Sequence, residues 1–255
     1  MKSICIILSV FVIVILSVFP AKAQHTVFLQ QGRIEYEKRV NAFARMDELN
    51  KGEENSWTEM IKKGMSQYQV TYFDYAFTNS TTLYKPGRDN PDNKVIPWQD
   101  APAEKNIVYS RLDSMQSIAQ KQVFEQNYLV KDTMRQIRWK ITDETRKIAG
   151  FDCRRANAVI MDSIYVVAFY TDAIVTPGGP ESFSGLPGMI LGVALPHEHI
   201  TWFATKVLVD DVKPETLKPP VKGKPVDNKG IRESITKVLG KWGRYGNSYI
   251  KSIML

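Results

Sequence analysis

The chain has 255 residues, of which 44% are hydrophobic and 11% aromatic, and its formal charge is +7. These proportions exclude a disordered chain, because they supply enough apolar surface for a sizeable core. The positive charge is modest and forms no arginine-rich stripe with interleaved aromatic residues, so we expect no nucleic-acid partner.

Residues 1–23 have the pattern of an export signal. Lys2 is followed by an apolar run over 4–19 and then by Ala21 and Ala23, which match the small-residue pattern of a cleavage site. The apolar run is short for a membrane span, and no second long run follows it. We therefore expect cleavage after Ala23, a mature chain without a transmembrane segment, and a periplasmic location.

Most of the remaining sequence consists of short β-prone runs separated by turn residues. A spacing of about ten residues per strand favours an antiparallel sheet over alternating β-α-β units. The expected strands are Gly32–Val40, Tyr68–Phe77, Thr81–Tyr84, Asn106–Leu112, Ile118–Phe124, Tyr128–Asp132, Ile137–Thr142, Cys153–Met161, Ile164–Thr171, Met189–Leu195 and His199–Val209. We assign residues 24–212 to one mainly β domain.

The expected strand Ile164–Thr171 indicates how the sheet is covered. Alternation gives it two apolar faces, one with Ile164, Val166, Ala168 and Tyr170 and the other with Tyr165, Val167 and Phe169. An antiparallel strand of this kind needs cover on both sides. A curved sheet with a helix over its concave face would supply that cover, and would enclose either an apolar pocket or a packed core.

Two segments favour helices. Residues 53–64 place Trp57, Met60 and Ile61 at helical spacing, which predicts a short helix after the first strand. Residues 213–226 are rich in proline and lysine and are expected to form an extended linker. The last segment, 227–255, predicts an amphipathic helix that ends at Gly240 or Gly243 and is followed by a tail. The apolar face of this helix is formed by Ile231, Ile235, Val238, Leu239 and Trp242.

A motif precedes the expected strand Met189–Leu195. Residues 179–184 read GPESFS, and Gly185–Ile190 reads GLPGMI. This resembles the GLPGLI family, exported proteins of Gram-negative bacteria named for that motif, with Met189 in place of the eponymous leucine. The family has no established activity, so the resemblance implies an envelope location and transfers no catalytic residue.

The motif has two physical interpretations. Gly185 and Gly188 permit a positive φ, while Pro187 fixes its own φ and restricts Leu186 to extended geometry. In the structural interpretation these residues form a rigid turn that holds the loop against the sheet. In the functional interpretation they form a recognition loop for a ligand or partner, made by Phe183, Gly185, Leu186, Pro187, Gly188 and Met189.

A candidate metal site involves His197 and His199, which flank Glu198. If this stretch is extended, both imidazoles project to the same side, and such a pair can supply two ligands to Zn²⁺ or Cu²⁺. Cys153 is a third candidate ligand if the fold brings it near. The alternative for the two histidines is a polar loop that begins at Pro196. The alternative for Cys153 is a buried, inert thiol. Alternation places Arg154 on the opposite face of the strand, where its charge would not activate the thiol.

The sequence lacks the common catalytic arrangements, including the nucleophile elbow, the zinc-protease helix motif and the P-loop. We therefore expect a non-enzymatic protein without a cofactor, with a curved sheet similar in outline to lipoprotein-carrier half-barrels. Its expected partner is a hydrophobic ligand or an outer-membrane or periplasmic protein. The alternative is a periplasmic copper- or zinc-handling protein that uses His197 and His199.

Overall fold

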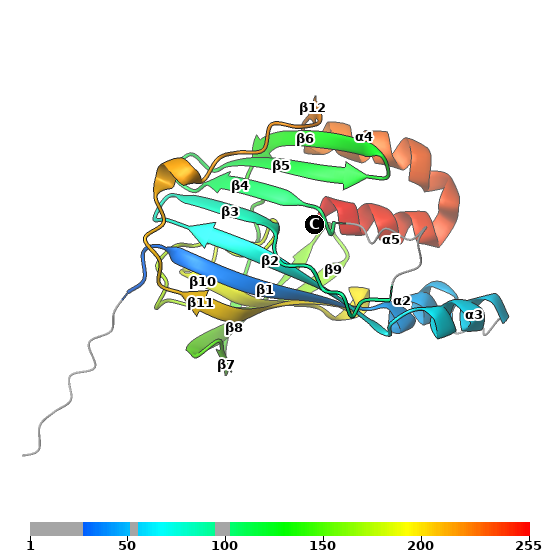
Figure 1. Ribbon diagram of the computed structural model, residues 1–255, viewed down its shortest axis with the longest axis horizontal. Helices are drawn as coiled ribbons and strands as arrows, with labels where there is room; N and C mark the ends of the chain where they lie inside the picture. The colour runs from blue at the N-terminus through cyan, green and yellow to red at the C-terminus, as the bar shows by residue number, and fades with distance from the viewer. Residues whose placement is uncertain (1–27, 52–55, 95–102) are drawn as a thin grey trace, which may run out of the picture.

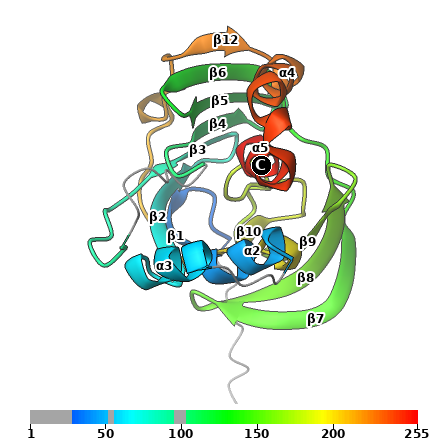
Figure 2. The ribbon, with the colours of Figure 1, turned by 90° about the vertical axis from the view of Figure 1, so that its right-hand side faces the viewer.

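The computed structural model describes residues 28–51, 56–94 and 103–255, so the expected signal at 1–23 lies outside the described residues. The described residues form one twelve-stranded sheet that curves strongly without closing into a barrel (Figures 1 and 2). Its strands are β1 (Gly32–Asn41), β2 (Tyr68–Phe77), β3 (Thr81–Pro86), β4 (Ile107–Arg111), β5 (Gln116–Val123), β6 (Gln126–Thr133), β7 (Lys140–Ile148), β8 (Phe151–Ile160), β9 (Ile164–Thr171), β10 (Met189–Leu195), β11 (Ile200–Leu208) and β12 (Lys224–Val226).

The strand order is β12-β6-β5-β4-β3-β2-β1-β11-β10-β9-β8-β7. Neighbouring strands are antiparallel except for β12, which runs parallel to β6. The prediction of a mainly β, curved sheet is confirmed, and the sheet is mixed because the segment before the C-terminal helices adds one parallel strand. The sequence predicts an extended linker over residues 213–226; within that segment Leu217 is buried, and β12 forms one edge of the sheet.

The predicted C-terminal helix is α4 (Asn228–Leu239), which ends just before Gly240. A second helix, α5 (Gly243–Met254), occupies the stretch where the sequence predicted a tail. Figure 2 shows α5 inside the curve of the sheet and α4 beside β6. Ile231, Ile235 and Leu239 of α4 are buried, as are the final residues 253–255. The helices therefore cover the concave face, as the amphipathic pattern predicted.

Near the N-terminus, the structure has two helices where the sequence predicted one. The expected helix corresponds to α3 (Ser56–Gly64), and a further helix, α2 (Ala42–Leu49), follows β1 without a loop. Asn41 is both the last residue of β1 and the N-cap of α2, since its side-chain oxygen accepts a hydrogen bond from the Ala44 N–H. This direct junction left no turn signal in the sequence.

Both faces of β9 are covered, as its apolar alternation predicted. Ile164, Val166, Ala168 and Tyr170 pack in one cluster that includes Phe183, Leu186 and Leu255. On the other face, Phe169 packs in a second cluster with Ile148, and the Arg146 guanidinium lies over the Phe169 and Phe203 rings. One cover is thus the loop before β10 together with the C-terminal residues, and the other is β7.

Among the residues that the structure describes, every helix is too short or too polar to cross a bilayer. The longest helices, α4 and α5, have 12 residues each. A bilayer requires about 20 apolar residues in a helix.

Close packing of α4 against α5 depends on Gly246, because a Cβ there would lie 1.9 Å from the Leu239 carbonyl oxygen. We expect Gly246→Ala to lower the free energy of unfolding by roughly 2 kcal/mol or more. Gly240→Ala is the matched control, since its Cβ would meet only the Thr236 methyl at 3.5 Å. Urea unfolding of both variants checks this, and equal midpoints would contradict the packing described.

Candidate functional site

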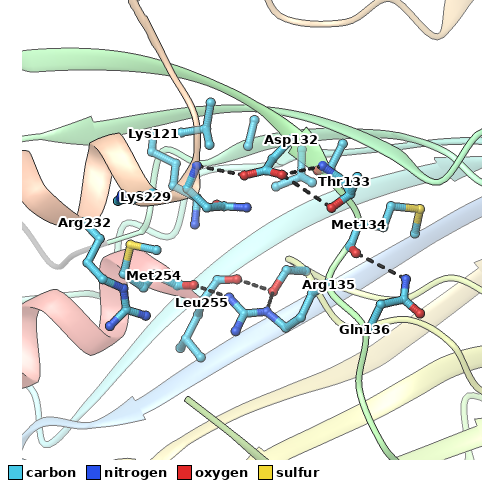
Figure 3. Close-up of a pocket in the computed structure, with 16 residues that line it drawn as sticks. Lys121, Asp132, Thr133, Met134, Arg135, Gln136, Lys229, Arg232, Met254 and Leu255 are labelled. Carbon is cyan, nitrogen blue, oxygen red and sulfur yellow. Dashed lines mark hydrogen bonds between the residues drawn. The ribbon is translucent and has the colours of Figure 1, made fainter. Parts of the chain in front are cut away.

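A cavity of about 470 Å³ lies on the concave side of the sheet, between β4–β6 and the C-terminal helices (Figure 3). Side chains of the strands form one wall, and the start of α4 and the end of α5 form the other. Its charged lining residues are Lys121, Asp132, Arg135, Lys229 and Arg232. Its apolar lining residues are Val108, Ala119, Val130, Met134, Met254 and Leu255. The cavity therefore combines an apolar part with an excess of positive charge.

Lys121 lies on the inward face of β5, in register with the buried residues Ala119 and Val123. Its ammonium group donates a hydrogen bond of 2.6 Å to the Ile253 carbonyl oxygen. Burial lowers the pKa of Lys121 from 10.5 to about 8, while the Glu181 carboxylate acts in the opposite direction. Lys121 is thus a buried cation that loses its charge at a lower pH than an exposed lysine does.

Arg135 follows β6 and binds the last residues of the chain. Its Nε donates to the Ser182 hydroxyl at 3.1 Å, and its Nη2 donates to the Met254 carbonyl oxygen at 2.5 Å (Figure 3). The Ser182 hydroxyl in turn donates to the Leu255 carbonyl oxygen. Burial lowers the pKa of Arg135, and the nearby charge of Arg232 lowers it further.

Asp132 is the one side-chain carboxylate among the described residues of the lining, and backbone groups hold it. Asp132 accepts hydrogen bonds from the N–H of Asn228, at 2.9 Å, and of Thr133, at 2.7 Å. These bonds, led by that from Asn228, hold the pKa of Asp132 below its usual value. Because Asn228 begins α4, the Asp132 carboxylate compensates the positive end of the helix dipole. Among the described residues, Asp132 forms no ion pair with a cation of the cavity.

Behind this cavity lies a buried polar cluster around Glu181. The carboxylate accepts hydrogen bonds from the Asn106 amide, at 2.9 Å, and from the Tyr84 hydroxyl, at 3.4 Å. Lys38, whose pKa is lowered by burial, also lies within the electrostatic range of Glu181. One carboxylate thus balances part of the charge of Lys38 and Lys121 inside the core.

The GLPG segment lies in the loop between β9 and β10. Phe183, Leu186 and Met189 are buried, while Gly185 and Pro187 are exposed. The Trp139 indole N–H donates to the Ser184 carbonyl oxygen at 2.9 Å, and Phe183 packs against Trp202. These contacts hold the loop against the sheet, as the structural interpretation of the motif requires. Recognition of a ligand or partner by the exposed residues stays a prediction.

Gly188 is the position in this segment where the backbone requires glycine. Its φ is +139°, and a Cβ there would lie 2.1 Å from the Thr171 carbonyl oxygen. The positive φ and the close approach together fix how the loop enters β10.

The candidate metal ligands lie in different surroundings. His197 is in a 3₁₀ turn, η1 (Pro196–Glu198), and His199 adopts a left-handed conformation, so the stretch is not extended. The His199 imidazole lies 2.9 Å from the Glu48 carboxylate. Cys153 is fully buried in the core, where burial raises the pKa of its thiol to about 12. Within residues 28–51, 56–94 and 103–255, no group of three or more His, Cys, Asp or Glu residues could hold a metal ion. Metal binding stays a prediction without support from this geometry.

Sequence reasoning missed the charged residues of the cavity. Lys121 carried a signal, because it alternates with Ala119 and Val123 on what became the inward face. Arg135 and Ser182 lie in loops, where no periodicity reports the direction of a side chain. Arg232 lies on α4 next to the buried Ile231, and its pattern in the sequence is that of an ordinary surface cation. Only the structure shows that Arg232 lines the cavity.

The chain shows local similarity to a protein family without a known activity. A family described as "Protein of unknown function (Porph_ging)" matches residues 158–192. This stretch runs from the end of β8 through β9 and the GLPG segment into β10. No curated protein matches the chain.

Two solved structures share the fold. They are crystal forms of PNGF-II, in space groups C2 and P2₁, and each superposes with a TM-score of 0.52 at 14% sequence identity. The alignments cover 84% of this chain and 33% and 34% of the two PNGF-II chains. This chain thus spans about one third of the length of PNGF-II, and the likeness is one of fold.

The backbone at Gly188 generates the first prediction for the site. Gly188→Ala should lower the free energy of unfolding by roughly 3 kcal/mol, because positive-φ strain and a backbone clash act together. Gly185→Ala is the control, since φ is +90° but the nearest atom to its Cβ would be 3.8 Å away. We expect a loss of only about 1 kcal/mol there, from strain alone. Equal losses in urea unfolding would contradict a tight approach at Gly188.

The depressed pKa of Lys121 generates the second prediction. Between pH 8 and 10.5 the unfolded chain retains the proton that the folded chain loses, so raising the pH through this window favours the folded state. The free energy of unfolding should rise by about 3 kcal/mol across this pH window. Lys121→Met should lack this rise. Urea unfolding of both proteins at several pH values measures it, and parallel pH profiles would show that Lys121 titrates normally.

Proposed function

We propose that this protein is an exported, non-enzymatic binding protein of the GLPGLI family whose concave cavity holds a ligand with an anionic group and an apolar portion. The observation that carries the proposal is the pair Arg135 and Arg232. Both line the cavity. Burial lowers the pKa of Arg135, and the nearby positive charge of Arg232 lowers it further. Among the described residues neither forms an ion pair with a carboxylate. Two guanidinium groups that line one cavity without a carboxylate partner favour the binding of an anion.

The apolar part of the lining sets the second property of the ligand. Met254 and Leu255 lie beside the arginines (Figure 3). Val108, Ala119 and Val130 add apolar surface from the strands. A small inorganic ion would leave this surface unfilled. A carboxylate or phosphate with an attached hydrocarbon portion uses both parts of the cavity.

The sequence predicted a purely apolar ligand or an envelope protein partner. The structure places the cations Lys121 and Arg135 in the lining of the cavity, so the proposal adds an anionic group to the ligand. The GLPG loop contributes Ser182 to the cavity wall, and this hydroxyl accepts from Arg135. The motif behind the family resemblance therefore supports the wall of the proposed site, and a periplasmic location is part of the same proposal.

Calorimetric titration of the protein with dodecanoate and with 1-dodecanol tests this function. The two probes share a hydrocarbon chain and differ in charge. We expect dodecanoate to bind at least about tenfold more tightly, which corresponds to roughly 1.4 kcal/mol from the charged group. Arg232→Gln should weaken dodecanoate binding about five- to tenfold and leave dodecanol unchanged.

Lys237→Gln is the matched control for Arg232→Gln, because Lys237 is an exposed cation of the same helix that does not line the cavity. Equal affinity for both probes would contradict the anionic part of the proposal. Absence of binding by both probes, in protein that unfolds cooperatively, would contradict the binding function itself.

A further inference from the structure

The turn between α4 and α5 exposes apolar side chains that the amphipathic pattern assigned to the core. Val238 and Trp242 are 56% and 54% exposed, whereas Ile231, Ile235 and Leu239 of the same predicted face are buried. The helix ends at Leu239, and η3 (Gly240–Trp242) turns the chain away from the sheet. Trp242 is therefore carried outward on a turn, where no described element covers most of its surface.

Aromatic side chains from two elements gather at this turn. Phe124 lies in the hairpin between β5 and β6, with a ring centroid 5.9 Å from that of Trp242 and 5.7 Å from that of Tyr249. Tyr245, at the start of α5, is half exposed, and its hydroxyl donates to the Asn50 side chain after α2. Exposed aromatic side chains that gather at one turn are typical of an interaction site.

Cations surround these aromatic residues. Lys237, Lys241 and Arg244 are exposed, and among the described residues none of them forms an ion pair. We define the aromatic-basic cap as Phe124, Lys237, Val238, Lys241, Trp242, Arg244 and Tyr245.

The carboxylates around the cap are few or already paired. Glu48 and Glu198 line the same surface pocket as Arg244, and they pair with His199 and Lys251. Glu125 is exposed in the hairpin beside Phe124. The cap therefore has three cations, and Glu125 is the one nearby carboxylate for which no ion pair is described. The net charge of the cap is positive.

We propose that the aromatic-basic cap docks the protein on a bilayer that contains anionic phospholipids. Tryptophan and tyrosine have an apolar ring with a polar tip and partition into the headgroup region, while lysine and arginine are attracted to anionic headgroups. The turn between α4 and α5 lies at one end of the molecule (Figure 1). The exposed aromatic and basic side chains of the cap lie on this turn and on the neighbouring hairpin between β5 and β6. It shares no residue with the lining of the cavity, so docking is independent of the proposed ligand.

The test is sedimentation with vesicles, using the chain that begins at Gln24 because the apolar run over 4–19 would itself insert into a bilayer. Vesicles contain phosphatidylcholine alone or equal parts of phosphatidylcholine and phosphatidylglycerol. We expect at least about tenfold stronger partitioning to the anionic vesicles, and weaker partitioning as salt is added. Failure to bind the anionic vesicles at low salt would overturn the proposal.

Charge variants locate the contact. Replacing Lys237, Lys241 and Arg244 together by Gln should lower partitioning about a hundredfold, at roughly fivefold per cation. The control replaces Lys218, Lys222 and Lys224 by Gln, which removes the same charge from exposed positions outside the cap. Equal losses in the two triple variants would show a general charge effect and overturn the assignment to the cap.

Aromatic variants test insertion. Trp242→Ala should lower partitioning about tenfold. Phe28→Ala is the control, since Phe28 is 53% exposed and lies outside the cap. Unchanged partitioning of Trp242→Ala would overturn insertion of the aromatic residues. Arg232→Gln, which alters the cavity, should bind vesicles as the unchanged protein does, so failure of the ligand proposal and failure of this one are distinguishable.

Discussion

The fold depends on covering the concave face of a sheet that curves without closing. A closed barrel satisfies its own interior, but an open, curved sheet leaves an apolar inner wall that another element must bury. Here α4 and α5 supply that cover through Ile231, Ile235 and Leu239 and through the final residues 253–255. The loop before β10 adds Phe183 and Leu186 on the inner side of β9. The strands, the loop and the helices are therefore held by one shared interior.

The same interior explains why the cavity is charged. The carbonyl groups at the end of α5 have no further turn of helix to accept their hydrogen bonds, so other donors must reach them. Lys121 and Arg135 supply those donors to Ile253 and Met254. Bringing cations to the end of a buried helix also compensates its dipole. The requirement to satisfy the end of a covering helix thus places positive charge inside an otherwise apolar space.

Periodicity predicted the parts of the fold in which side-chain direction follows from alternation. β10 has the predicted bounds, and both faces of β9 are covered as its pattern required. The amphipathic pattern near the C-terminus correctly predicted a helix over the concave face, but the break at Gly240 moved Trp242 from core to surface. Arg135 and Ser182 escaped prediction for a different reason: they lie in loops whose paths depend on packing between distant segments. β12 escaped because three residues are too few for a strand pattern to be recognised.

An open sheet also has two unpaired margins, and their composition bears on how the protein behaves at high concentration. One margin is β12, which is three residues long and contains Lys224 and Pro225. The other is β7, whose outward positions include Lys140, Glu144 and Lys147. Short length, proline and charge each discourage a second chain from adding a strand to an exposed margin. The composition of both margins therefore disfavours edge-to-edge pairing of one sheet with another, the first step of self-assembly into fibres.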